Sequence, residues 1–171
     1  MLELIIVIVV AGILAAVMIP RLERDNLREA ANQLVRHIQY TQHLAMVDDV
    51  YNAGDTNWYK NRWSIDLCSR AYAVKRANGS ETAADPLTKR DINGTDNNLA
   101  DLGITAISPA TGNCKITFDN LGRPYSWTTI PATPVAGLLN ADATVTLNAG
   151  ARTAVITITK ETGFVKLTSF N

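Results

Sequence analysis

The first twenty residues form a nearly uninterrupted apolar block. From Leu4 to Ile19 there is no charged or strongly polar side chain, and Glu3 is the only charge within residues 1–19. A helix over residues 1–19 is about 28 Å long at ~1.5 Å per residue, and the apolar core of a bilayer is roughly 30 Å thick. We therefore predict an apolar helix over residues 1–20 that can cross a membrane, or nearly so.

A helical pattern continues beyond this block, because apolar residues recur at steps of three and four. They fall at Leu27, Ala30, Ala31, Leu34, Val35, Ile38 and Ala45. This spacing is typical of one helix face, and no glycine or proline interrupts residues 21–50. We predict that the helix runs on to about Asp48, so that residues 21–50 form an amphipathic segment whose apolar stripe covers a globular head.

Beyond residue 50 the pattern changes to short alternating runs rich in Thr, Val and Ile, separated by Gly, Asn, Asp and Pro, which predicts antiparallel strands. The expected strands cover residues 62–68, 71–75, 114–119, 125–129, 143–147, 153–159 and 164–168, with loops at 78–98 and 131–139. The last three strands follow one another through tight turns and predict a meander. A long helix followed by strands predicts an α+β fold, with residues 51–171 as a β-rich head.

Charge and motifs narrow the function. Sixteen basic and sixteen acidic residues give a formal net charge of +0, so no field of the whole molecule favours nucleic acid. The two histidines, His37 and His43, are six residues apart and do not share a helix face. No GxSxG, P-loop or GxGxxG motif is present, and the oxygen-rich segment 91–96 lacks the closing glutamate of a calcium loop. We predict no enzymatic activity, no cofactor, no metal site and no small-molecule substrate.

The two cysteines, Cys68 and Cys114, are expected to form a structural disulfide. A membrane-targeting segment upstream places them in an oxidising compartment, where pairing is the default. The alternative, a redox or metal site, lacks a CxxC motif or a nearby histidine pair.

Glu3 is the exceptional residue of the apolar block. A carboxylate near the end of a membrane helix costs on the order of 2–3 kcal/mol. Either it lies at the level of the lipid headgroups, or it pairs with a cation of another chain, and the residue alone does not decide between the two.

The segment LELIIVIVVAGILAAVMIP resembles the N-terminal signature of type IV pilins and type II secretion pseudopilins, the class III signal-peptide and N-methylation motif. Glu3, Gly12 and Pro20 occupy its glutamate, glycine and proline positions. In that family a peptidase cuts after a glycine, and the glutamate follows the new N-terminal residue by four positions. Glu3 here follows Met1 by two residues, so we expect the first two mature residues, the leader and its cleavage site to lie outside this sequence. A secretory signal peptide has a shorter apolar region and a basic start, which disfavours that alternative.

The resemblance implies a pilin fold, in which a long N-terminal helix packs against an antiparallel sheet. It also implies a homopolymeric helical filament, with the inner membrane, the prepilin peptidase and the pilus assembly machinery as partners before polymerisation. Glu3 would pair with the N-terminal ammonium of the next subunit. Residues 12–20 would either kink or unwind in the fibre.

The head is more loosely similar to minor pilins and pseudopilins, through AANQLVRHIQYTQHLAM, RWSIDL, FDNLGRP and ITITKETGFVKL. Three functions are therefore considered. The first is a subunit of an extracellular surface filament, which serves adhesion, motility, DNA uptake or secretion. The second is a minor pilin or a pseudopilin that primes a periplasmic pseudopilus. The third, a DNA receptor, ranks lowest because the tail offers Lys160 and Lys166 but no arginine cluster.

Overall fold

The structure, a computed structural model, describes residues 2–109, 114–127 and 129–171. Within these ranges, the side chains of residues 2, 4, 16–25 and 96 are not described.

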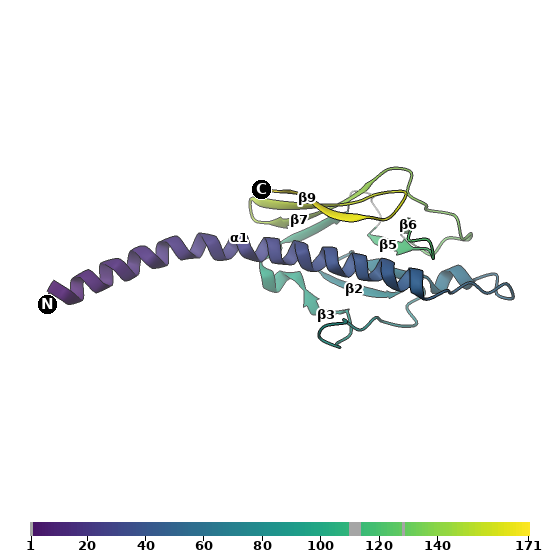
Figure 1. Ribbon diagram of the computed structural model, residues 1–171, viewed down its shortest axis with the longest axis horizontal. Helices are drawn as coiled ribbons and strands as arrows, with labels where there is room; N and C mark the ends of the chain where they lie inside the picture. The colour runs from purple at the N-terminus through teal and green to yellow at the C-terminus, as the bar shows by residue number, and fades with distance from the viewer. Residues whose placement is uncertain (1, 110–113, 128) are drawn as a thin grey trace.

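One long helix runs along most of the length of the molecule (Figure 1). Helix α1 covers Leu2–Val47 and passes through the positions of Gly12 and Pro20 without ending, as a gently curved rod whose first half extends beyond the head (Figure 1). The kink or unwinding expected at residues 12–20 of an assembled fibre is not tested by a single chain. Among the residues whose side chains are described, no helix is both long and apolar enough to cross a membrane. The membrane span predicted over residues 1–20 therefore stays a prediction.

The described strands form two antiparallel sheets rather than the single sheet that the sequence predicted. Sheet A has the order β3-β2-β1-β5-β6 and sheet B the order β4-β7-β8-β9. The strands of sheet A are β1 Trp63–Asp66, β2 Ala71–Arg76, β3 Asn93–Asn98, β5 Lys115–Phe118 and β6 Pro124–Trp127. The strands of sheet B are β4 Ala106–Pro109, β7 Ala143–Ala149, β8 Arg152–Ile158 and β9 Val165–Phe170. Two short 3-10 helices, η1 Trp58–Asn61 and η2 Leu99–Leu102, complete the described elements.

Strands β3 and β4 were not predicted from the sequence. The segment of β3, NGTDNN, holds no strand-forming apolar residue, and it becomes a strand only because it pairs with the edge of β2. Gly94 makes this pairing possible, because a Cβ there would lie 2.8 Å from the backbone oxygen of Ala71. Strand β4 pairs only with β7. The predicted meander β7-β8-β9 is confirmed.

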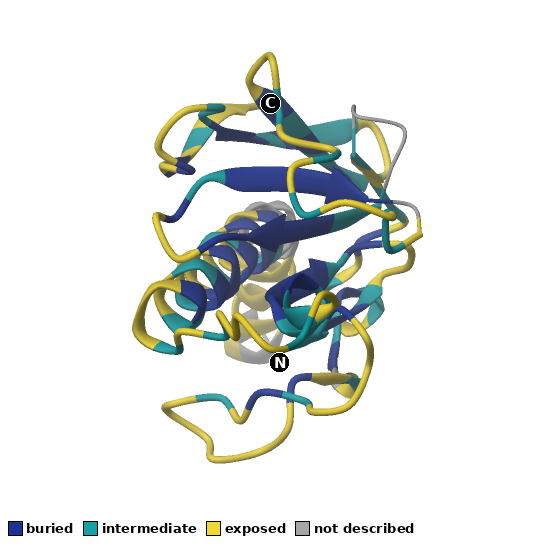
Figure 2. Ribbon diagram, turned by 90° about the vertical axis from the view of Figure 1, so that its right-hand side faces the viewer, coloured by how far each residue is buried: buried dark blue, intermediate teal, exposed yellow. Residues whose placement is uncertain are grey.

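The main core lies between the second half of α1 and both sheets. Every member of the predicted stripe from Leu27 to Ala45 is buried except Val35, which is half-buried. Residues of β1, β2 and β5 from sheet A and of β7, β8 and β9 from sheet B pack in the same cluster. Figure 2 shows the buried strands beside the helix, with exposed loops around them. The alanines at positions 30, 31 and 45 allow this close approach, because they add little bulk to the helix surface.

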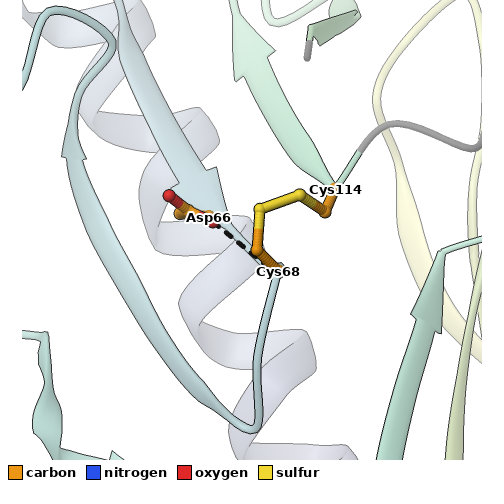
Figure 3. A group of neighbouring side chains, drawn as sticks. All are labelled: Asp66, Cys68 and Cys114. Atoms are coloured by element: carbon orange, nitrogen blue, oxygen red, sulfur yellow. Dashed lines mark hydrogen bonds between the residues drawn. A yellow bond between two sulfur atoms is a disulfide. The ribbon is translucent and has the colours of Figure 1, made fainter. Parts of the chain in front are cut away.

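A disulfide joins Cys68, which follows β1, to Cys114, which precedes β5 (Figure 3). The pairing predicted from the sequence is present, with the two Cα atoms 4.8 Å apart. The backbone N–H of Cys68 donates to Oδ1 of Asp66 at 3.2 Å. Asp66 and the two sulfurs lie close together, but the sulfurs are bonded to each other, so the group offers no thiolate ligands.

Polar contacts fasten α1 to strand β2 and to the loop between β2 and β3. Nδ1 of His37 lies 2.5 Å from the hydroxyl of Tyr72, and Nε2 lies 3.2 Å from Oδ2 of Asp85. Burial lowers the pKa of His37, so the ring is neutral at pH 7, accepts from Tyr72 and donates to Asp85. Burial also raises the pKa of Tyr72, so its fully buried hydroxyl stays protonated and donates to His37. Tyr40 adds a hydrogen bond to the backbone oxygen of Ala84.

Removal of the disulfide by a double Cys68→Ser, Cys114→Ser substitution is expected to destabilise the head. The bridge closes a loop with a sequence separation of 46, for which the chain-entropy model gives about 4 kcal/mol. Urea denaturation followed by circular dichroism measures the difference, and reduction of the wild type should reproduce it. An unchanged midpoint after reduction would contradict this prediction.

The stability of the head is expected to fall as the pH drops below 6.5, because of His37. Its pKa in the folded state lies below 6.5, so the unfolded chain binds a proton that the folded chain does not, and stability is lost as the pH falls below 6.5. The Asp85 carboxyl acts at lower pH. Burial raises the pKa of the Asp85 carboxyl, but hydrogen bonds from backbone N–H groups and from His37 outweigh burial. They hold this pKa below its ordinary value of 3.8. His37→Gln should flatten this dependence just below pH 6.5 in denaturation experiments. The exposed His43 supplies the control, since His43→Gln should retain the wild-type slope.

Candidate assembly surface

The first half of α1 presents an apolar surface that no described residue covers. Residues 5–15, called here the apolar half of α1, are all exposed, and the large side chains among them are 49–65% exposed. They point in every direction around the helix, because each successive residue is rotated by about 100°. A helix that is apolar on all sides is normally buried on all sides. The apolar half therefore lacks its partner in the isolated chain.

The predicted assembly residues Glu3, Gly12 and Pro20 all lie on this part of α1. Glu3 is exposed in the first turn, where a carboxylate interacts favourably with the helix dipole. Apart from the adjacent turns of α1 itself, no described atom lies within 4 Å of the position that a Cβ would take at Gly12. The side chain of Pro20 is outside the described residues. Glu3 and Gly12 are thus placed on an unpartnered rod, and their role in assembly stays a prediction.

The second half of α1 exposes a polar stripe on the face away from the core. Its members are Arg28, Asn32, Arg36, Gln39 and His43, and the stripe ends in the exposed apolar pair Met46 and Val47. The apolar periodicity predicts only the buried stripe, and the exposed polar stripe was not predicted. The signal was present, since the members of the polar stripe recur with the same steps of three and four residues.

Gln42 fixes the end of α1 to two turns of the head. Its Nε2 donates to the backbone oxygen of Gly122, in the β5–β6 turn, at 2.9 Å and to that of Thr162, in the β8–β9 turn, at 2.7 Å. Gly163 has a φ of +65°, and a Cβ at this position would collide with the backbone of Gly122. Glycine at position 163 therefore lets the two turns meet beside the helix.

The β5–β6 turn is held in shape by the buried carboxylate of Asp119. Oδ1 accepts from the backbone N–H groups of Leu121 and Arg123, and Oδ2 accepts from Nε of Arg123 at 2.8 Å. Hydrogen bonding to Asp119 also raises the pKa of Arg123. This rigid turn leaves the side chain of Leu121 exposed to solvent.

An apolar patch results where the helix meets these two turns. It consists of Met46, Val47, Leu121 and Phe164, which are all exposed and are called here the distal patch. A Cβ on Gly122 would lie 3.1 Å from Sδ of Met46, so Leu121 and Phe164 flank the last turn of α1. This patch was not predicted from the sequence, because its residues come from three separate segments.

Comparison with known proteins identifies the fold. No protein-family model and no curated protein matches the chain. Among solved structures, the chain is similar to the type IV minor pilin FimU of Pseudomonas aeruginosa, strain PAO1. The likeness covers 84% of this chain and 93% of that chain, with a TM-score of 0.50 and 15% sequence identity. The chain therefore has a pilin-like fold, with one N-terminal helix packed on antiparallel sheets.

Proposed function

We propose that this protein is a structural subunit of a type IV pilus-like filament and that it polymerises through the apolar half of α1. The observation that carries the proposal is the exposure of residues 5–15 on every side of a helix that extends beyond the head. Only a surrounding apolar medium covers such a surface, either lipid or other copies of the same helix.

Polymerisation would exchange one apolar environment for another. Before assembly, the apolar half would anchor the chain in the bacterial inner membrane. In the filament, the helices would bundle at the centre and the heads would form the outer shell on the cell surface. In both environments, keeping each Val, Leu or Ile side chain out of water contributes roughly 1.5–3 kcal/mol, and eight large apolar side chains are exposed between Ile5 and Leu14. The preference for the filament over the membrane would therefore come from close packing between helices.

A second candidate is a minor pilin or a type II secretion pseudopilin, which would prime or cap a short filament. The specific observation in its favour is the likeness of the fold to a minor pilin. The two candidates share the mode of assembly and differ in abundance. Mass spectrometry of filaments sheared from the cells would show this chain as the main component in the first case and as a minor one in the second.

Ile8→Asp is expected to abolish polymerisation, because it places a carboxylate in the middle of the apolar half. A carboxylate without a partner among packed apolar helices costs several kcal/mol, which predicts a drop of roughly tenfold or more in the polymer fraction. Electron microscopy and sedimentation of sheared filaments measure the result. Leu87→Asp is the matched control, since Leu87 is 89% exposed on the head and its change should leave filaments intact. Normal filaments from Ile8→Asp would refute the proposed function.

Glu3→Ala is expected to reach the membrane but not to enter filaments. If Glu3 pairs with a cation of the neighbouring subunit inside an apolar bundle, removal of one partner costs several kcal/mol, since the other charge stays buried and unpaired. Membrane fractionation and immunogold labelling of filaments separate the two steps. A variant that is incorporated at the wild-type level would show that Glu3 does not direct assembly.

A further inference from the structure

We propose that the cavity between α1 and the β2–β3 loop binds an N-acetylhexosamine, and that Asn97 recognises the acetamido group of this sugar. The proposal goes beyond the proposed function, because it assigns a ligand to the head and does not require the chain to polymerise. The sugar would be bound and released unchanged.

The cavity has a volume of about 340 Å³, which is near the lower limit of small-molecule sites. One wall is the stretch of α1 from Gln33 to Tyr40, and the other wall is formed by the loop residues 85–88, 90 and 91. Asn97, on strand β3, lines the cavity as well. The volume suits one small ligand that contacts all three segments.

Asp85 holds the loop wall in a fixed shape. Its Oδ1 accepts from the backbone N–H groups of Leu87, at 2.7 Å, and Thr88, at 3.2 Å. Its Oδ2 accepts from Nε2 of His37 on α1. The backbone N–H of Lys89 donates to the backbone oxygen of Asp85 at 2.9 Å. Because the loop is tied both to itself and to the helix, the cavity is formed before a ligand arrives, and binding needs little further ordering.

Asn97 supplies a polar group that the head leaves without a partner. The residue is only 8% exposed, yet its side-chain amide makes no hydrogen bond with any described residue. Buried side-chain amides are normally hydrogen-bonded, so this amide in the lining of a cavity indicates a ligand. An amide offers both donors and an acceptor, and a second amide satisfies the two kinds of group at once.

The charged groups that line the cavity balance one another. Arg36 and Arg90 are matched by Asp85 and Asp91, and His37 is neutral because burial lowers its pKa. Arg36 has no ion pair or hydrogen bond with the part of the chain that the structure describes, so its guanidinium can donate to a ligand. A hydroxyl group accepts from a guanidinium and donates to a carboxylate. The lining therefore favours a neutral ligand that carries hydroxyl groups.

The lining also includes apolar surface, from Pro86, Leu87 and the ring of Tyr40. The hydroxyl of Tyr40 already donates to the backbone oxygen of Ala84, so the ring is what this residue offers. A hexose has C–H groups on the faces of its ring and hydroxyl groups around the edge, which suits a cavity with both kinds of surface. Its N-acetyl derivative adds the amide that Asn97 requires. A peptide backbone supplies an amide as well, but it offers no hydroxyl groups to the charged side chains.

Saturation-transfer NMR on the full-length chain tests the ligand. The chain is kept in micelles of a detergent without a sugar headgroup, and N-acetyl-D-glucosamine is the probe. We expect transfer to its acetamido methyl and ring protons, and an affinity roughly tenfold above that of D-glucose, which lacks the acetamido group and its hydrogen bonds. N-acetylglycinamide, which has amides but no hydroxyl groups, should bind no better than D-glucose.

Substitution of Asn97 tests the recognition of the amide. In Asn97→Ala the affinity for N-acetyl-D-glucosamine should fall roughly tenfold, to that for D-glucose, whereas D-glucose itself should bind as it does to the wild type. Asn93→Ala is the matched control, since Asn93 is an exposed asparagine of the same strand outside the cavity lining, and it should keep the preference. Arg36→Ala should weaken both sugars alike. Thermal unfolding by circular dichroism verifies the fold of each variant.

Three results on the wild type alone would overturn the proposal: no transfer to N-acetyl-D-glucosamine, an equal affinity for D-glucose, or tighter binding of N-acetylglycinamide. The test therefore does not depend on the folding of a variant. A preference for the N-acetylated sugar that survives in Asn97→Ala would also overturn it, since the sugar would then bind elsewhere. None of these results bears on assembly, because binding is measured on unpolymerised chains.

Discussion

The structure depends on the burial of one face of α1 between two sheets. Alanine at positions 30, 31 and 45 keeps the helix surface shallow, and Leu27, Leu34 and Ile38 fill the space between it and the strands. Because strands from both sheets pack on the same stripe, neither sheet has a complete core without the helix. Polar contacts from His37, Tyr40 and Gln42 then fix the position of the head along α1.

This arrangement divides the helix into a half that completes the head and a half that the head does not use. The core cluster and the disulfide belong to the head, so the apolar half contributes nothing to its burial. The apolar surface of residues 5–15 is therefore available for assembly without loss of the fold. Since α1 is one continuous helix, it also sets a fixed distance between the apolar half and the distal patch, as a rigid spacer does.

The elements that the sequence predicted are those with a local signal. The three- and four-residue steps from Leu27 to Ala45 determined which helix face is buried, and alternation in the last third of the chain identified the β7-β8-β9 meander. The two missed strands have no such signal. Strand β3 is polar throughout, and it is a strand because β2 offers an edge and Gly94 lets the backbones approach. The division into two sheets was missed for the same reason, since pairing partners distant in sequence leave no local pattern.

By itself, the sequence determined the long helix, its apolar first half with Glu3 near the tip, the pairing of its two cysteines and the α+β class. These features follow from periodicity, composition and the count of cysteines, which are properties of neighbouring residues. Only the tertiary structure decided that α1 lies between two sheets, that Gln42 joins two turns at its end, and that Met46, Val47, Leu121 and Phe164 form one patch. The physical reason is that these contacts join segments that are separate in the sequence, 80 and 120 positions apart for the two hydrogen bonds of Gln42, and their proximity arises from the packing of the whole head rather than from any local preference.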